Sequence, residues 1–182
     1  SGEVSLVMHG GSADFLLLAF HSGNQTRCVL VSSDHDYTIE NQTANDPALR
    51  PAKISLADVP FIELTGWNND NFEQAGWQGI VALSAQQTGA ARAIFEITVD
   101  YLQTRYQFGR PIGSFQALKH IAADLFLEVE SAISASQAAA RALASKAPQT
   151  AQSVALAGFL CNDAFREVSA QAIQLHGGIA YT

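Results

Sequence analysis

The order of apolar and polar residues divides the chain into two parts with different periodicities. From about residue 1 to residue 64, short apolar segments alternate with clusters of turn-forming residues, a pattern typical of β-strands. From about residue 70 onward, apolar residues recur every three or four positions, which is the period of one face of a helix. The pattern predicts an α+β fold, with an antiparallel β part followed by a helical part.

Short strands are expected throughout the first part. Apolar side chains occupy alternate positions over residues 4–8, and Gly10-Gly11 then turns the chain. The uninterrupted apolar run at residues 15–20 is short and predicts a buried strand. Further strands are expected at residues 27–32, 53–56 and 61–64. Strands of this length predict a partial antiparallel sandwich or barrel, assigned to residues 1–66.

The second part is expected to form three helices. The first should run from about residue 72 to residue 106 and end where Gly109 and Pro111 interrupt the hydrogen-bond ladder. Ser114 is expected to cap the second helix, which should run to about residue 146. The third helix should span about residues 150–175. Long helices joined by short loops predict an up-down bundle, assigned to residues 67–182.

Composition and charge exclude several classes of protein. Of 182 residues, 48% are hydrophobic and 15% are charged, which excludes a disordered polymer. The net charge of -7 argues against a nucleic-acid partner, because phosphate backbones need clustered cations. Cys28 and Cys161 lack metal-ligand spacing, so we expect ordinary thiols in a reducing compartment and no metal site. With no recognisable signal peptide or membrane span, a cytoplasmic location is expected.

Two motifs near the ends of the expected helices carry the most specific chemistry. Residues 105–112 read Arg-Tyr-Gln-Phe-Gly-Arg-Pro-Ile and are followed by Phe115-Gln116. Residues 174–182 read Gln-Leu-His-Gly-Gly-Ile-Ala-Tyr-Thr. Upstream, Ala13-Asp14 and Asp58-Val59-Pro60 precede them in the β part. In this order the motifs resemble the acyl-CoA dehydrogenase family over nearly the whole chain.

The resemblance implies an FAD enzyme that oxidises an acyl-CoA thioester to a 2-enoyl-CoA, in fatty acid or steroid side-chain degradation. The family subunit has an N-terminal helical domain, a middle β domain and a C-terminal four-helix bundle. We expect the first domain, the start of the second and the last helix to be missing here. The resemblance also implies a homo- or hetero-tetramer that shares FAD across the subunit interface. An electron-transfer flavoprotein is the expected kind of electron acceptor.

By resemblance, seven residues are expected to contact FAD, in part from a neighbouring subunit: Arg105, Gln107, Phe108, Gln116, Gln174, Gly177 and Gly178. A guanidinium offers a fixed fork of donors to phosphate oxygens, and a glycine backbone can approach a phosphate closely. Simpler explanations stay open. The glycines can form a helix cap and turn, Arg105 can pair with Asp100 or Glu96, and Gln116 can be an exposed helix residue.

The sequence departs from the family pattern at two places. The family's catalytic glutamate lies at one of two positions, one beyond residue 182 and the other at Gly79, so no catalytic residue is assigned in this chain. Glu73, the nearest carboxylate, lies more than a turn upstream. Residues 6–8, Leu-Val-Met, replace the Trp-Ile-Thr segment that packs beside the flavin. These departures leave open a non-catalytic partner subunit of a hetero-oligomeric enzyme. One further alternative is a flavin oxidase or monooxygenase with the same fold. Another is a helical scaffold without a ligand.

Overall fold

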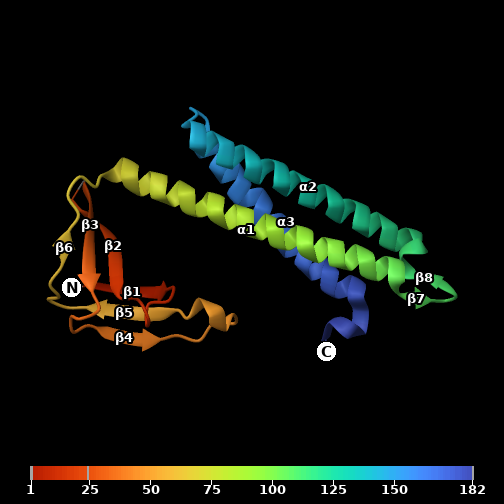
Figure 1. Cartoon of the computed structure of the whole chain (residues 1–182), viewed down its shortest axis with the longest axis horizontal. Helices are drawn as coiled ribbons and strands as arrows, with labels where there is room; N and C mark the ends of the chain where they lie inside the picture. Colours follow the sequence, from red (N-terminus) through yellow and green to blue (C-terminus); the bar gives the residue numbers. More distant parts are fainter. Residues whose placement is uncertain (1, 24, 182) are drawn as a thin grey trace. The chain divides into compact units, whose positions relative to one another are not determined.

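The computed structural model describes residues 2–23 and 25–181. Contacts divide the chain into two compact units, with the division between Glu73 and Gln74, inside the first turns of α1 (Asn69–Thr104). The first unit is built of strands and the second of helices (Figure 1). The α+β fold predicted from the sequence is confirmed. The assignment of residues 1–66 and 67–182 to two domains stays a prediction.

The strands of the first unit pair in two antiparallel sheets. In the first sheet, β5 (Ala52–Leu56) lies between β1 (Gly2–Val7) and β4 (Thr38–Asn41). In the second sheet, β3 (Gln25–Ser32) lies between β2 (Phe15–Ser22) and β6 (Ile62–Glu63). The sequence pattern did not predict β4, because it carries one apolar residue and forms through its pairing with β5. The expected strands at residues 53–56 and 61–64 correspond to β5 and β6.

The two sheets enclose one small apolar core. Leu16, Val29 and Val31 from the second sheet pack with Ala52 and Ile54 from the first. Two antiparallel sheets that share a core form a partial sandwich, as predicted.

The expectation of a buried strand at residues 15–20 is wrong. Of the residues described in β2, Leu16 alone is buried, and Phe15 and Leu17 are each 59% exposed. Side chains of a strand alternate between the two faces of its sheet, and one face of β2 packs on the core while the other is exposed.

The described part of the second unit contains three long helices that alternate in direction along the chain (Figure 1). After α1, α2 (Gln116–Ser145) runs back along it, and α3 (Thr150–His176) reverses direction again. The turn between α2 and α3 begins at Lys146, which has a left-handed backbone (φ 50) and donates its N–H to carbonyls of the last turn of α2. The up-down bundle is therefore confirmed.

Ser114 does not cap α2 as the sequence predicted. It ends the short 3-10 helix η2 (Ile112–Ser114), and Phe115 occupies the cap position without a side-chain hydrogen bond. The Ser114 hydroxyl is buried and has no hydrogen-bond partner among the described residues. The backbone of η2 reverses the chain here, so the N-terminus of α2 begins one residue later than the serine would require.

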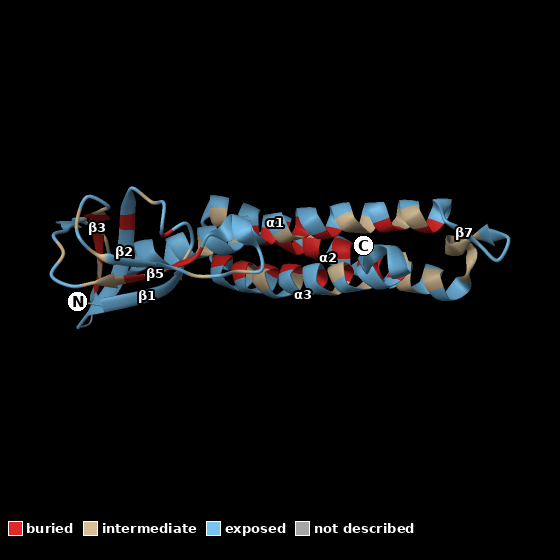
Figure 2. Ribbon diagram, turned by 90° about the horizontal axis from the view of Figure 1, so that it is seen from below, coloured by how far each residue is buried: buried red, intermediate tan, exposed pale blue. Residues whose placement is uncertain are grey.

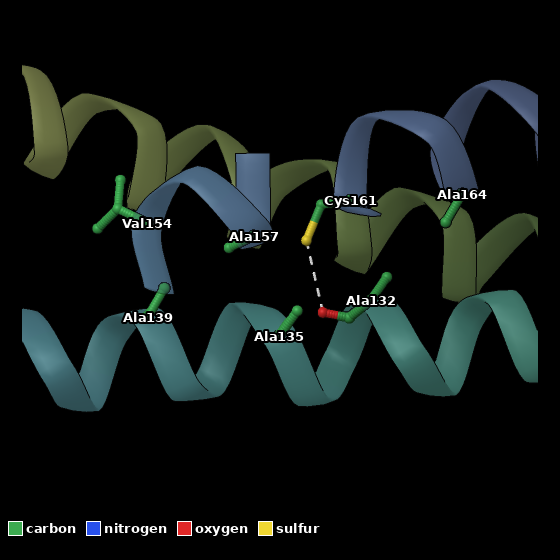
Figure 3. Packing of buried hydrophobic residues seen from close by; sticks show 7 residues of the cluster. All are labelled: Ala132, Ala135, Ala139, Val154, Ala157, Cys161 and Ala164. Carbon is green, nitrogen blue, oxygen red and sulfur yellow. Dashed lines mark hydrogen bonds between the residues drawn. The ribbon is translucent and has the colours of Figure 1, made fainter. Parts of the chain in front are cut away.

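Helices α2 and α3 pack closely through short side chains (Figure 3). Figure 2 shows that the buried faces of the helices turn toward one another. The buried residues between α2 and α3 are mostly alanines: Ala132, Ala135, Ala139, Val154, Ala157, Cys161 and Ala164. Short side chains allow two helix backbones to approach. The Sγ of Cys161 donates to the carbonyl oxygen of Ala132 at 3.4 Å.

Helix α1 packs on the pair through larger side chains. Trp77 and Val81 lie against the alanine-rich cluster, and Ile94 and Phe95 lie against a second cluster that includes Leu125. None of the helices in the described residues combines the length and apolar character that crossing a bilayer requires.

Candidate functional site

The first motif forms a tight hairpin directly after α1. Its strands are β7 (Tyr106–Gln107) and β8 (Arg110–Pro111), and Gln107 lies opposite Arg110. Phe108 (φ 55) and Gly109 (φ 77) form the two-residue turn, and both have the positive φ that a type I′ turn requires. The turn holds Phe108 at the tip, where it is 90% exposed, and its ring lies nearly perpendicular to the Phe115 ring with centroids 6.1 Å apart.

Arg105 has a fixed backbone and a free side chain. Its N–H donates to the carbonyl oxygen of Tyr101 at 2.9 Å, and its own carbonyl accepts the N–H of Ile112 at 2.8 Å. The side chain is exposed and, within residues 2–23 and 25–181, its guanidinium forms no ion pair. Its position just after the C-terminus of α1 favours a cation.

The alternative that Arg105 pairs with Glu96 or Asp100 is wrong. Glu96 instead accepts a hydrogen bond from Arg92, one turn earlier on α1, with 2.8 Å between Nε and Oε1. This pairing raises the pKa of Arg92, mainly through the side-chain hydrogen bond. In the described residues, Asp100 has no ion pair either. The Arg105 charge is therefore available to a ligand.

The second motif forms the glycine turn, by which we mean Gly177 and Gly178. Gly177 caps α3 with φ 64, and its N–H donates to the carbonyl oxygen of Gln174. Gly178 follows in the 3-10 helix η3 (Gly177–Tyr181). A Cβ atom added at either glycine would meet nothing within 4 Å. The glycine turn is thus a helix cap whose surface is open enough for another group to approach.

The structure brings the ends of α1 and α3 together. The rings of Tyr101 and His176 stack with centroids 4.5 Å apart and planes 24° from parallel. The Tyr101 hydroxyl also donates to the carbonyl oxygen of His176 at 3.4 Å. Because Tyr101 precedes Arg105 by one helical turn and His176 directly precedes Gly177, Arg105 and the glycine turn lie at the same end of the bundle.

The three glutamines predicted to contact FAD are less closely connected to Arg105 and the glycine turn. Gln116 is exposed at the start of α2, and its side-chain Nε2 lies 3.5 Å from His120 Nε2. Gln107 and Gln174 are exposed as well. Among the described residues, no side-chain hydrogen bond, ion pair or ring contact joins these glutamines to Arg105 or to the glycine turn. Their contacts with a cofactor stay a prediction.

Sequence reasoning missed the residues that connect the two motifs. Tyr101 and His176 are 75 positions apart, so no local pattern signals their contact. Arg110 was also missed as a structural residue; its guanidinium carbon lies 4.0 Å from the centroid of the Phe115 ring, a cation–π contact. The alternation of cationic and aromatic residues in the hairpin was the available signal for that contact.

No carboxylate lies at Gly79, the position on α1 where the sequence resemblance places a catalytic base. Gly79 is exposed there and a Cβ atom would meet nothing within 4 Å, while Glu73 is exposed near the start of the helix. Within the described part of the chain, no group of three or more His, Cys, Asp or Glu side chains could hold a metal ion. The chemistry that this region can supply is binding of an anion by one free guanidinium and by glycine backbone.

Comparison with known proteins assigns the family. A family model described as the acyl-CoA dehydrogenase C-terminal domain matches residues 79–182. The acyl-CoA dehydrogenase IpdE2 of Mycobacterium tuberculosis (strain ATCC 25618 / H37Rv) is 45% identical over 179 residues, which cover 97% of this chain and 49% of that protein.

Solved structures have the same fold. A variant of the Tcur3481-Tcur3483 steroid ACAD is 27% identical, with a TM-score of 0.87 over 99% of this chain and 49% of that chain. The structure of PigA with FAD and proline is 20% identical, with a TM-score of 0.89 over 100% of this chain and 50% of that chain, and its likeness is one of fold. The chain spans about half the length of these proteins. The motifs, the fold and these relatives together show that the chain belongs to the acyl-CoA dehydrogenase family.

Proposed function

We propose that the protein that contains this chain is an FAD-dependent acyl-CoA dehydrogenase, which converts an acyl-CoA thioester to its 2-enoyl-CoA. Family membership supports the reaction class. The observation that carries the cofactor assignment is the unpaired Arg105 guanidinium at the same end of the bundle as the open glycine turn.

The residues fit the diphosphate of FAD. Charge-assisted hydrogen bonds from a guanidinium to phosphate oxygens are among the stronger hydrogen bonds in proteins. The glycine turn exposes backbone without side chains, so a phosphate can approach it. Gln107, Phe108, Gln116 and Gln174 would line the remainder of the site. Bound FAD would supply the acceptor for the hydride; the residues of this chain would bind and orient it.

We further propose that FAD is shared between subunits of a tetramer. Arg105 and the exposed Phe108 both lie on the bundle surface, where they can reach a cofactor held mainly by a neighbour. The Tcur3481-Tcur3483 steroid ACAD carries two protein designations, which supports a hetero-oligomer and a bulky acyl-CoA such as a steroid side-chain thioester. An electron-transfer flavoprotein is the proposed acceptor. A cytoplasmic location stays a prediction.

The enzyme is favoured over a non-catalytic partner subunit, because the similar curated relatives are themselves named acyl-CoA dehydrogenases. The general base is not assigned to this chain, since Gly79 occupies the family position on α1. We therefore propose that a carboxylate outside residues 1–182, in the same protein or in a partner subunit, removes the substrate's α-proton.

The test is expression from the complete gene, alone and with candidate partner subunits, followed by measurement of bound flavin and its bleaching by acyl-CoA. We expect stoichiometric FAD, and bleaching by steroid side-chain thioesters in preference to short straight chains. Rapid oxygen consumption by the reduced flavin would indicate an oxidase or monooxygenase instead. A protein that holds no flavin with any partner would refute the proposal.

Arg105→Gln tests the phosphate contact. Loss of one charge-assisted hydrogen-bonding group should raise the FAD dissociation constant about ten- to a hundredfold, and Arg105→Lys should restore part of the affinity. Arg110→Gln is the matched control, because it removes a cation from the same hairpin whose guanidinium already packs over the Phe115 ring. Equal FAD affinity in Arg105→Gln and the parent protein would contradict the assignment.

A further inference from the structure

The contact between Tyr101 and His176 is the direct link between the two motifs of the candidate site. It joins helices that are adjacent only in space, and it combines ring stacking at 4.5 Å with a hydrogen bond from the Tyr101 hydroxyl to the backbone of His176. The His176 ring is itself fixed, because Nδ1 donates to the carbonyl oxygen of Ala172 at 2.8 Å. The His176 ring is therefore held by its own helix, and the Tyr101 ring is held by its contacts with His176 on the other helix.

Each ring belongs to a residue whose backbone leads into the candidate site, at Arg105 for Tyr101 and at Gly177 for His176. The carbonyl oxygen of Tyr101 accepts the N–H of Arg105 at 2.9 Å, so the position of Tyr101 determines where the arginine leaves the helix. On α3, His176 is followed directly by Gly177, whose positive φ starts the turn.

Glycine has more conformational freedom than any other residue. In the glycine turn, a Cβ at either position would meet no neighbour within 4 Å, so surrounding side chains restrain the turn little. The residue that precedes the turn can supply restraint beyond the hydrogen bond from the Gly177 N–H to the Gln174 carbonyl oxygen. His176 does so because its ring is held against α1 by Tyr101.

We infer that Tyr101 and His176 are positioning residues for the cofactor site. Their stacked rings hold the end of α3 against the end of α1, and so set the spacing between Arg105 and the glycine turn. The inference rests on the proposed function for the identity of the ligand, FAD. The spacing itself is a property of this chain's own residues.

Tyr101→Leu and His176→Leu test the inference in the FAD-loaded protein. Loss of an aromatic pair should raise the FAD dissociation constant about three- to tenfold. His176→Phe should keep the parent affinity, since it keeps the stacked ring. If His176→Phe loses as much affinity as His176→Leu, ring stacking does not set the FAD affinity and the positioning role is refuted.

The decisive measurement is a double-mutant cycle between Tyr101→Leu and Arg105→Gln. A positioning role predicts that Tyr101→Leu weakens FAD binding in the parent but has little further effect once the Arg105 guanidinium is gone. An equal loss in both backgrounds would overturn the inference. The control is Phe126→Leu, which removes a ring contact between α1 and α2 (centroids 6.2 Å apart) and should leave FAD affinity unchanged.

Hydrogen exchange without FAD separates this inference from the proposed function. Tyr101→Leu should speed amide exchange at residues 177–181, and Phe126→Leu should not. If the parent protein binds no FAD but exchange changes in this way, the cofactor assignment fails while the contact between the two helix ends stands. Unchanged exchange in Tyr101→Leu would refute the positioning role by itself.

Discussion

Gly113 lies against the backbone of Leu102, so closely that a Cβ atom at Gly113 would be 2.8 Å from the Leu102 carbonyl oxygen. Leu102 is buried in the last turn of α1, and Gly113 lies in η2, just after the hairpin. This close approach returns the chain from the hairpin to the bundle and so determines where Arg105 and Phe108 are presented.

Gly113→Ala should therefore destabilise the protein. The added methyl group would force η2 away from α1, at a cost of about 1–3 kcal/mol, as in other overpacked sites. Thermal and denaturant unfolding would measure the loss. The matched control is Gly76→Ala on α1, where a Cβ atom meets nothing within 4 Å, and which should gain about 0.5–1 kcal/mol from helix propensity. A stabilised Gly113→Ala variant would show that this contact is not tight.

Two buried threonines on α1 should respond oppositely to replacement by valine. The Thr98 hydroxyl donates to the carbonyl oxygen of Ile94 at 2.7 Å, so Thr98→Val should cost about 0.5–1.5 kcal/mol. The Thr88 hydroxyl is buried without a protein partner among the described residues, so Thr88→Val should be neutral or stabilising by up to about 1 kcal/mol. Chemical unfolding of both variants is the measurement. A clear loss in Thr88→Val would mean that its hydroxyl is satisfied in solution.

Helices α2 and α3 should tolerate a large side chain at Ala138 but not at Ala139. Ala139 is fully buried between the helices (Figure 3), whereas its neighbour Ala138 is exposed. Ala139→Leu should cost about 1–3 kcal/mol or more, because the helices must separate. Ala138→Leu adds the same atoms outside the interface and should change stability by less than about 0.5 kcal/mol. Equal melting temperatures for the two variants would contradict the close packing of α2 on α3.

The ion pair between Arg27 and Glu63 should make stability depend on pH. Two hydrogen bonds of 2.7 and 2.6 Å from the Arg27 guanidinium to the Glu63 carboxylate join β3 to β6. The side-chain hydrogen bond from Arg27 is the main cause that lowers the pKa of Glu63. A carboxyl whose pKa is lower in the folded state contributes stability above its unfolded pKa of about 4.3. That contribution is lost as pH falls through the lower folded pKa.

Unfolding from pH 7 to pH 3 would check this prediction. The parent should lose more stability over this range than Glu63→Gln, and added salt should shrink the difference, since both side chains are exposed. Glu40→Gln is the control, because Glu40 on β4 forms no ion pair in the described ranges. The same pH dependence in Glu63→Gln and the parent would exclude the pair as its source.

The sequence by itself determined the class of the fold and the family. The change of period near residue 70 separates strands from helices, and glycine and proline mark helix ends, because these signals depend on backbone conformations within a few residues. Gly109 and Gly177 both have positive φ, which the motifs require of glycine. The positions of α1, α2 and α3 follow from the same local signals.

The tertiary structure alone decided which residues meet. The stacking of Tyr101 on His176, the burial of one face of β2, and the pairing that creates β4 all join segments distant in sequence. That Phe115 and not Ser114 occupies the cap position of α2 likewise depends on how η2 turns against Leu102. Periodicity identifies the apolar face of an element but not the partner that covers it, because that choice depends on helix spacing and side-chain volume across the whole unit.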